Sequence, residues 1–539
     1  MILAAAVPLQ APTAPSAAVT CALPTIEAVQ IVRHDVFEST GEESWLYRTV
    51  NNLHVRTREV VVRRELLFAP GDRMDLEALA QSERNLRATR FLSAVQIELL
   101  DVDGALLIDP STSPLKQLCA AVAEHESVIV RVTTHDSWST LLETTFRKAG
   151  DEFIFGIGLE ENNFLGRGKT LLVFHRDDID RTSNAVAYTD PRLAGTRLAL
   201  RAEYADQSDG GRGVAEIGQS FYALDTKWSY SARVESFDQE DPLYFAGDEV
   251  SRLRHVRQWQ EVSVARLLRQ RGSRALRFHV AYRRRYDDVS VDTRRFGILE
   301  VGLSSDQHAF REYDHLNHER TEDVNLGTQS ELSLGFSSTA LGGSGSALFL
   351  SASHERGIPL GDARFVLARA SWDGRLEHGS VRNGIGDASV TLVDLSASRR
   401  VLLLSARYRH GTRLDPEVQV TLGAQNGLRG YGVHQFVGTR SLLLSAERRW
   451  FLIDNLARVF SLGLAAFIDS GYAWTQAESL DLGDLKTNLG ISLLLGRRQV
   501  STDRAGTRID LAYALDPVYG HSHWLLSFGN ITQIEGNAR

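Results

Sequence analysis

Residues 460–471 read Phe-Ser-Leu-Gly-Leu-Ala-Ala-Phe-Ile-Asp-Ser-Gly, and this stretch indicates the kind of fold. Phe460, Leu462 and Leu464 begin a series of apolar residues at every second position, so in an extended strand they share one face. Asp469 then points to the opposite face. A carboxylate inside a closed sheet needs a cationic partner, because an unpaired buried charge is costly.

The same alternation fills most of the chain from about residue 149 onward. Apolar side chains share one face of each segment, and the other face is charged and rich in arginine. A soluble sandwich would bury the apolar face, whereas a membrane β-barrel turns it toward lipid and keeps its charges in a wet interior. The arginine-rich faces favour the barrel. The clearest segments are 197–204, 276–283 and 402–409.

A candidate partner for Asp469 lies 40 positions earlier (469 − 429), in the segment Gly427-Leu428-Arg429-Gly430-Tyr431. Glycines flank the arginine, and the segment falls in a long stretch between two strand patterns. Such a loop can fold into the barrel and bring its cation to the carboxylate. Alternatively, the two residues are unrelated, one in a surface loop and one at a strand end.

Together these segments resemble the signature motifs of BamA-like outer-membrane barrels and two-partner-secretion transporters, the bacterial surface antigen superfamily. In that family a loop carrying (V/I/L)-R-G-(F/Y) folds into the barrel, and its arginine meets the aspartate of an F-x-D-x-G strand. An ion pair in a wet lumen is screened and worth less than ~1 kcal/mol, so we expect the pair to position the loop within the barrel. It assigns the loop motif to Leu428, Arg429, Gly430 and Tyr431, and the barrel-wall motif to Phe467, Asp469 and Gly471.

We expect the barrel to occupy residues 150–539. About 390 residues, at roughly 24 for each strand and its loop, allow about sixteen antiparallel strands. Residues 160–168 resemble the family's entry into its first barrel strand. The closing strand is expected over residues 522–528, with Trp524, Leu526 and Phe528 pointing outward.

Residues 25–140 combine helix and strand patterns in the order β-α-α-β-β, which resembles a single polypeptide-transport-associated (POTRA) domain. Such a small α+β domain precedes the barrel in the family just named and lies in the periplasm. The expected elements are a strand over 26–37, a helix-like stretch opening near Ser44, a helical run from Thr57 to Phe68 with Thr57 as a possible cap, a clearer helix after Asp75, and strands through Val95–Leu99 and Val128–Val132.

Residues 1–24 are expected to be a leader or a disordered tail. The stretch from Met1 to Ala18 is small and apolar but has no basic beginning, so it is a poor signal peptide. Cys21 and Cys119 can form a disulfide in an oxidising compartment. Alternatively they stay unpaired, and the sequence before Cys21 is only a weak match to a lipoprotein site.

Composition excludes several functional classes. The formal net charge of −8 gives no basic bias toward nucleic acid. No run of about 18 apolar residues exists, so a membrane-spanning helix is excluded. The 12 prolines and the lack of an obvious linker favour few domains.

Motifs for chemistry are weak throughout the chain. Gly168-Lys169-Thr170 lacks the first glycine of a phosphate loop, and Ser113-x-x-Lys116 has no accompanying triad. His315-x-x-His318-Glu319 has possible metal-ligand spacing, but a solvated polar loop explains it better. We therefore expect no catalytic residues, no cofactor, no metal and no enzyme activity.

The resemblance implies a protein of the bacterial outer membrane that assists the insertion or translocation of polypeptide clients. Its POTRA-like domain would take an unfolded or strand-like client by edge pairing, and its barrel would contact outer-membrane lipid. The alternative is a passive, porin-like diffusion channel in which the same strands line a pore. A hydrolase within the barrel is a third possibility without a supporting triad. The client and the oligomeric state stay open.

Overall fold

The computed structural model describes residues 23–37, 54–110, 115–122, 124–149, 152–317, 321–456, 460–497, 506–518 and 522–530. It divides into two compact units at Asp136. The first contains the strand Thr25–His34 and residues from Arg56 to Asp136. The second contains the chain from Ser137 onward, together with the short piece around Val55.

The N-terminal unit is a four-stranded sheet with helices. Its strands stand in the order β1-β4-β2-β3, with β1 parallel to β4 and the other neighbours antiparallel. The elements are β1 (Thr25–His34), α2 (Glu59–Glu65), α3 (Leu76–Arg87), β2 (Leu92–Leu100), β3 (Leu106–Ile108), α4 (Leu115–Val122) and β4 (Ser127–Asp136).

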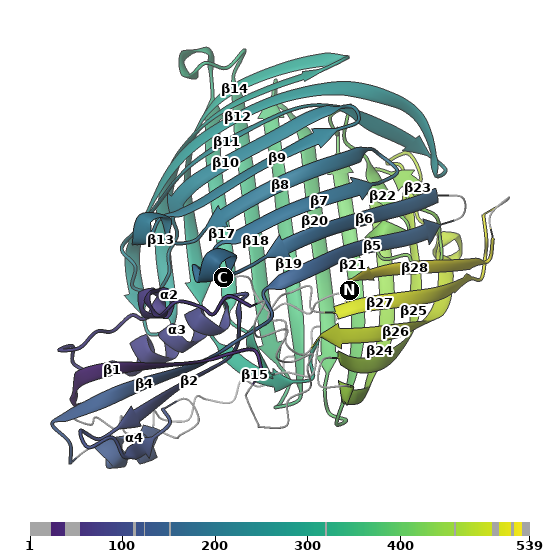
Figure 1. The fold of residues 1–539 in the computed structure, drawn as a ribbon. Helices are drawn as coiled ribbons and strands as arrows, with labels where there is room; N and C mark the ends of the chain where they lie inside the picture. Colours follow the sequence, from purple (N-terminus) through teal and green to yellow (C-terminus); the bar gives the residue numbers. More distant parts are fainter. Residues whose placement is uncertain are drawn as a thin grey trace, which may run out of the picture. The chain divides into compact units, whose positions relative to one another are not determined.

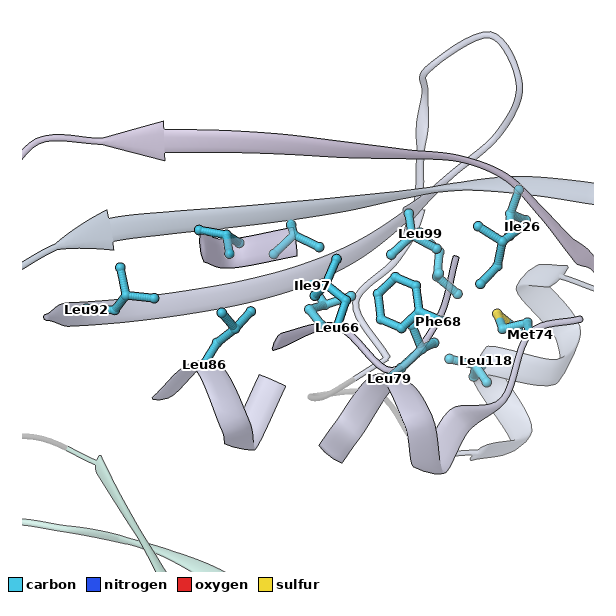
Figure 2. Packing of buried hydrophobic residues seen from close by; sticks show 14 of the residues in the cluster. Ile26, Leu66, Phe68, Met74, Leu79, Leu86, Leu92, Ile97, Leu99 and Leu118 are labelled. Atoms are coloured by element: carbon cyan, nitrogen blue, oxygen red, sulfur yellow. The ribbon is translucent and has the colours of Figure 1, made fainter. Parts of the chain in front are cut away.

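Apolar side chains from the helices and from one face of the sheet form the core of this unit (Figure 2). Leu79 and Leu86 supply the buried stripe of α3, which begins after Asp75 because that carboxylate accepts a hydrogen bond from the amide of Glu77. Ile97 and Leu99 are completely buried on β2. Each such side chain contributes about 1.5–3 kcal/mol on burial.

Most of the elements expected in this unit are present, with two additions. The short strand β3 and the helix α4 were not expected from the sequence. Thr57 is not a helix cap: Arg58 precedes α2 without a side-chain hydrogen bond, and the Thr57 amide donates instead to the Asp136 carboxylate at 2.7 Å. The helix expected near Ser44 lies outside the described residues.

Of the two cysteines, only Cys119 belongs to the described residues. Cys119, in α4, is disulfide-bonded. Its expected partner, Cys21, lies outside the described residues, as do the leader-like residues at the N-terminus. Among the described residues, none of the helices combines the length and the apolar character that crossing a bilayer requires.

The second unit is a closed antiparallel barrel of twenty strands (Figure 1). The strands are β5 (Thr140–Ala149), β6 (Glu152–Glu161), β7 (Thr170–Asp177), β8 (Thr182–Asp190), β9 (Ala199–Gln207), β10 (Gly210–Gln219), β11 (Trp228–Phe245), β12 (Asp248–Arg271), β13 (Arg274–Val289), β14 (Asp292–Gln307), β17 (Thr328–Ser337), β18 (Ala347–Pro359), β19 (Arg364–Glu377), β20 (Ser380–Asp394), β21 (Arg400–Thr412), β24 (Arg440–Leu456), β25 (Phe460–Trp474), β26 (Lys486–Arg497), β27 (Gly506–Ala514) and β28 (Trp524–Asn530).

The expectation of about sixteen strands from residue 150 was therefore wrong. Many turns are shorter than assumed: Gly272-Ser273 alone joins β12 to β13, and Ser208-Asp209 joins β9 to β10. The barrel also begins earlier, with β5 at Thr140. Residues 160–168, which resembled the entry to the first strand, form the end of β6 and the turn that follows it.

The barrel turns its apolar face outward, as the sequence pattern predicts. Val264 is 49% exposed and Tyr204 57% exposed, whereas Asp287 and Asp469 are completely buried. A soluble sandwich would show the reverse distribution. An apolar outside around a charged inside suits a wall with lipid on one face and water or paired charges on the other.

The barrel closes between its last strand and its first. In β28, Trp524 and Leu526 are exposed and Leu525 and Ser527 are buried, which is the expected orientation, although Phe528 is only half-exposed. Ser527 paired with Arg147 is the only β28–β5 register pair in the described part of the chain. Seven register pairs join β28 to its other neighbour, β27.

Two insertions enter the barrel from opposite ends. Residues 413–439 follow β21 and contain β22 (Val420–Leu422) and β23 (Phe436–Gly438). Residues 308–327 follow β14 and contain β15 (Phe310–Asp314) and β16 (Thr321–Asn325). Four strands stand between β14 and β21 around the antiparallel barrel, so β14 and β21 run in opposite directions and their insertions lie at opposite ends.

Candidate functional site

The loop of residues 413–439, here called the lumen loop, carries the arginine motif. β22 pairs with β23, and the resulting hairpin holds a compact tip between them. The Leu428 amide donates to the Gly423 carbonyl at 3.0 Å, and the Tyr431 amide donates to the Leu428 carbonyl at 3.2 Å. Leu428 and Tyr431 are buried among apolar residues of the loop and of the barrel wall, namely Leu422, Phe436, Ala473 and Ala514.

Arg429 projects from this tip into a group of carboxylates on the wall. Its Nε and Nη2 donate to the two oxygens of Asp469, at 2.8 and 2.7 Å, which makes a bidentate pair. Its Nη1 donates to Glu447, and its guanidinium lies 3.6 Å from the centre of the Phe467 ring. Burial opposes the charge, but these carboxylates outweigh it and raise the pKa of Arg429.

Asp469 is saturated with donors. Besides Arg429 it accepts hydrogen bonds from the Ser445 hydroxyl at 2.7 Å and from the Asn488 amide at 3.0 Å. Its side chain is completely buried, and that of Arg429 is 13% exposed. The pair therefore lies away from water, not in the wet, screened setting assumed from the sequence, and removal of one partner is correspondingly more costly.

Glu447 connects this pair to a wider cluster, here called the tip anchor. Arg449 donates to Glu447 at 2.7 Å, and Arg508 donates to it at 3.2 Å. Arg508 also binds Asp510, at 2.8 and 3.0 Å. Three arginines thus meet three carboxylates, because Arg429 and Asp469 complete the set. The loop supplies one of the three positive charges that neutralise this part of the wall.

Two glycines allow the loop to approach the wall so closely. A Cβ at Gly430 would lie 2.4 Å from the Asn488 Cβ on the wall, and one at Gly471 of the wall would lie 2.9 Å from the Leu422 Cδ2 of the loop. Tyr431 completes the motif by donating to the carbonyls of Thr487 and Asp516, at 3.0 and 3.2 Å. Burial, together with the charge of Asp516, raises the pKa of Tyr431 to about 12.

The beginning of the lumen loop has an ionic anchor of its own, here called the stem anchor. Arg375 makes a bidentate pair with Asp415, at 2.8 and 2.7 Å. Arg294 binds both Asp415 and Glu417. Every one of these four side chains is at most 7% exposed. Here the loop supplies the carboxylates and the wall supplies the cations.

A third set of contacts joins the lumen loop to the β11–β12 hairpin. The Gln419 side chain exchanges hydrogen bonds with the backbone of Tyr244, at 2.9 and 3.1 Å. The rings of Tyr244 and His434 stack with centroids 4.1 Å apart. Gln435 donates to the Ala246 carbonyl at 2.8 Å. The loop is therefore held at its stem, at its tip and at the side of its hairpin.

The structure brings Arg429, Phe467 and Asp469 together, with Gly430 and Gly471 at the points of closest approach. Sequence reasoning missed Glu447, Arg508 and the whole stem anchor. Inward-facing Glu447 and Arg449, two positions apart on β24, carried a signal in the alternation pattern. Their meeting with β27 depends on strand register, which the pattern does not give.

The chain resembles BamA and CdiB. A solved structure of BamA from Haemophilus ducreyi lacking POTRA domains 1–3 shares 11% identity and a TM-score of 0.36, covering 93% of this chain and 84% of that one. CdiB from Escherichia coli shares 13% identity and a TM-score of 0.45, covering 94% and 76%. OccK11 (OpdR) from Pseudomonas aeruginosa shares 11% identity and a TM-score of 0.32, covering 72% and 92%.

Sequence comparisons add nothing to these structural likenesses, because no family model and no curated protein matches the chain. In the described part of the chain, no group of three or more histidine, cysteine, aspartate or glutamate side chains is arranged to hold a metal ion. His318 and Glu319 of the weak metal pattern lie outside the described residues.

Proposed function

We propose that this protein is a bacterial outer-membrane barrel that assists the insertion or translocation of polypeptide clients. The observation that carries the proposal is the lumen loop, which is held inside the barrel by two buried ionic anchors. A passive pore needs an open lumen. A loop fixed at its stem and tip instead occupies the lumen, as in the family whose motifs Arg429 and Asp469 resemble.

The outer surface of the barrel supports a membrane location. Exposed apolar residues recur at alternate positions on strand after strand, for example Val262 and Val264 on β12 and Leu332 and Leu334 on β17. Such a surface is unfavourable in water and favourable in lipid. The paired charges of the lumen then need no contact with the hydrocarbon.

The N-terminal unit supports a POTRA-like role in the periplasm. Its sheet ends in two edge strands, and β1 offers an edge ten residues long. An extended client can add to such an edge through backbone hydrogen bonds, with little demand on its sequence. An unfolded or strand-like polypeptide is therefore the client class that this unit suits.

The closure of the barrel suggests where a client strand leaves. The wall closes there between its first strand, β5, and its last, β28, which no hairpin turn connects. These two strands can therefore separate without straining a short turn, unlike neighbours joined by a hairpin. We propose that this seam opens sideways toward the bilayer during insertion.

Conductance in planar bilayers tests the occupied lumen. The full-length protein is expected to give a small, fluctuating conductance, because the lumen loop obstructs the pore. A large and steady conductance would instead establish the diffusion channel. That alternative has support in Arg407, which points inward but keeps 47% of its side chain exposed, so part of the lumen is open to water.

A disulfide across the seam tests the lateral exit. Arg147→Cys combined with Ser527→Cys places two cysteines on a directly opposed pair. In proteoliposomes, folding of a urea-unfolded eight-stranded barrel is expected to slow when this pair is oxidised and to recover on reduction. Either cysteine alone is the control. Equal folding rates in the oxidised and reduced states would refute the seam as the exit.

A further inference from the structure

One end of the β11–β13 region carries five cations, here called the basic rim: Lys227, Arg266, Arg269, Arg271 and Arg274. All five residues are exposed. Among the described residues, none of the five forms an ion pair with a carboxylate. Elsewhere in the barrel most arginines have such a partner, for example Arg364 with Asp394 at 3.0 Å.

The turn between β12 and β13 concentrates this charge. Arg271 and Arg274 are direct cross-strand partners on either side of Gly272-Ser273. Two like charges at opposed positions of a hairpin repel each other and destabilise it. Arg274 has one described side-chain contact, a hydrogen bond of 2.9 Å to the neutral Gln307. An anion bound between the two arginines would remove the repulsion.

Arg266 shows which environment this end of the barrel meets. It lies opposite Trp228 on β11, with its guanidinium 5.2 Å from the indole ring. Trp228 is 48% exposed, and Val264 and Leu268 flank Arg266 on the same outward face at 49% and 54%. A tryptophan and an arginine at the border of a lipid-facing surface are typical of the headgroup level of a bilayer.

We propose that the basic rim binds the phosphate-bearing headgroups of anionic phospholipids in the leaflet around this end of the barrel. The inference rests on the proposed membrane location. Phosphate oxygens would accept hydrogen bonds from Arg271 and Arg274 and neutralise the opposed pair. Arg266 would reach the same level from the outer wall, with Trp228 fixing its depth.

The leaflet follows from strand direction. The β12–β13 turn lies at the barrel end opposite to the lumen loop, the end where β5 begins. In the proposed orientation this end faces the periplasm, where the inner leaflet consists of phospholipid. Phosphatidylglycerol is therefore the probe of choice, and lipopolysaccharide is the competing source of phosphate from the other leaflet.

The test measures lipid selectivity without any client. The full-length protein is placed in phosphatidylcholine bilayers, and the association of spin-labelled phosphatidylglycerol is compared with that of spin-labelled phosphatidylcholine. The wild type is expected to prefer phosphatidylglycerol. The double variant Arg271→Gln/Arg274→Gln should lose that preference by roughly fivefold per arginine.

The control is Arg364→Gln/Arg399→Gln, which removes the same charge at the same end of the barrel from arginines that already have carboxylate partners. It should keep the wild-type preference. Equal selectivity in the wild type and the Arg271/Arg274 variant overturns the inference. So does full displacement of the lipid by inorganic phosphate, or a preference that appears only with lipopolysaccharide or an added acidic protein.

Failure of this inference and of the proposed function can be told apart. A protein that enters the bilayer and shows no lipid preference refutes only the basic rim. A protein with the preference and a large, steady conductance refutes only the occupied lumen. A protein that does not enter the bilayer refutes both.

Discussion

The two ionic anchors of the lumen loop are built with opposite polarity. At the tip, the loop supplies a cation, Arg429, to carboxylates of the wall. At the stem, the loop supplies carboxylates, Asp415 and Glu417, to cations of the wall. The tip and the stem therefore cannot exchange partners, because Arg429 would then face the wall arginines and the stem carboxylates would face the wall carboxylates. The opposite charges of the two anchors thus determine which end of the loop binds which part of the wall.

The tip should be the more sensitive anchor. Arg429→Ala leaves two buried carboxylates, Asp469 and Glu447, without their loop cation, and we expect a loss of about 3–5 kcal/mol in the stability of the docked loop. The variant should still insert into membranes but should show impaired transport. Urea unfolding and trypsin cleavage within the loop measure the effect. Arg413→Ala, an exposed arginine of the same loop, is the control, and equal sensitivity of the two would contradict the anchor.

The stem should tolerate loss of one partner better. Asp415→Asn takes a carboxylate from Arg294 and Arg375, but Glu417 still binds Arg294, and Glu377 lies 3.0 Å from Arg375. We expect a smaller loss, about 1–3 kcal/mol, in the same unfolding assay. Asp362→Asn changes an exposed aspartate and should be neutral. A loss at Asp415 larger than the loss at Arg429 would reverse the ranking of the anchors.

The Tyr431 hydroxyl donates its hydrogen bond only in its neutral form, so its contribution to the stability of the docked loop depends on pH. Tyr431→Phe removes the hydroxyl whose single hydrogen is shared by the carbonyls of Thr487 and Asp516, and this should cost about 1 kcal/mol. The pKa of Tyr431 is raised from 10.0 to about 12 in the folded loop, so the neutral form is favoured there. The wild-type advantage over the phenylalanine variant should be complete below pH 10 and should fade between pH 10 and 12. A constant difference over that range would exclude this contribution.

The smallest expected effect is the coupling between the anchors. If tip and stem act independently, the double variant Arg429→Ala/Asp415→Asn should show the sum of the two single losses to within about 0.5 kcal/mol. A larger coupling would mean that the loop leaves the wall as one rigid piece. The double-mutant cycle separates these cases with the same unfolding measurement.

Much of the fold could be predicted from the sequence, because successive side chains of a strand point to opposite faces and so produce an alternation of apolar and polar residues. Outward Leu276, Val280 and Tyr282 and inward Arg277 follow the expected faces. The strand count failed because it depends on turn lengths, and two-residue turns such as Gly272-Ser273 leave little trace in a hydropathy pattern. β5 was missed for a similar reason, since it follows the N-terminal unit after only a short connection.

The residues of the candidate site could be predicted from the sequence only where they belong to a recognisable motif. Arg429 and Asp469 stand out by their flanking glycines and their strand context. Asp415 and Arg375 do not, because neither lies in a recognisable pattern and their meeting depends on how the loop crosses the lumen. The expected strength of the Arg429–Asp469 ion pair was also wrong. The sequence predicted a solvent-exposed pair, whereas the structure buries the pair among Phe467, Ser445 and Asn488.

The second insertion, residues 308–327, lies at the barrel end opposite to the lumen loop. Its Tyr313, Leu316 and Val324 pack against inward-facing apolar residues of the wall such as Phe365 and Val401. Together they form a buried apolar cluster at this end of the barrel. In the proposed function, a polypeptide that threads lengthwise passes both insertions, whereas a strand that leaves sideways between β28 and β5 passes neither. The positions of the two insertions therefore favour the sideways route within that proposal.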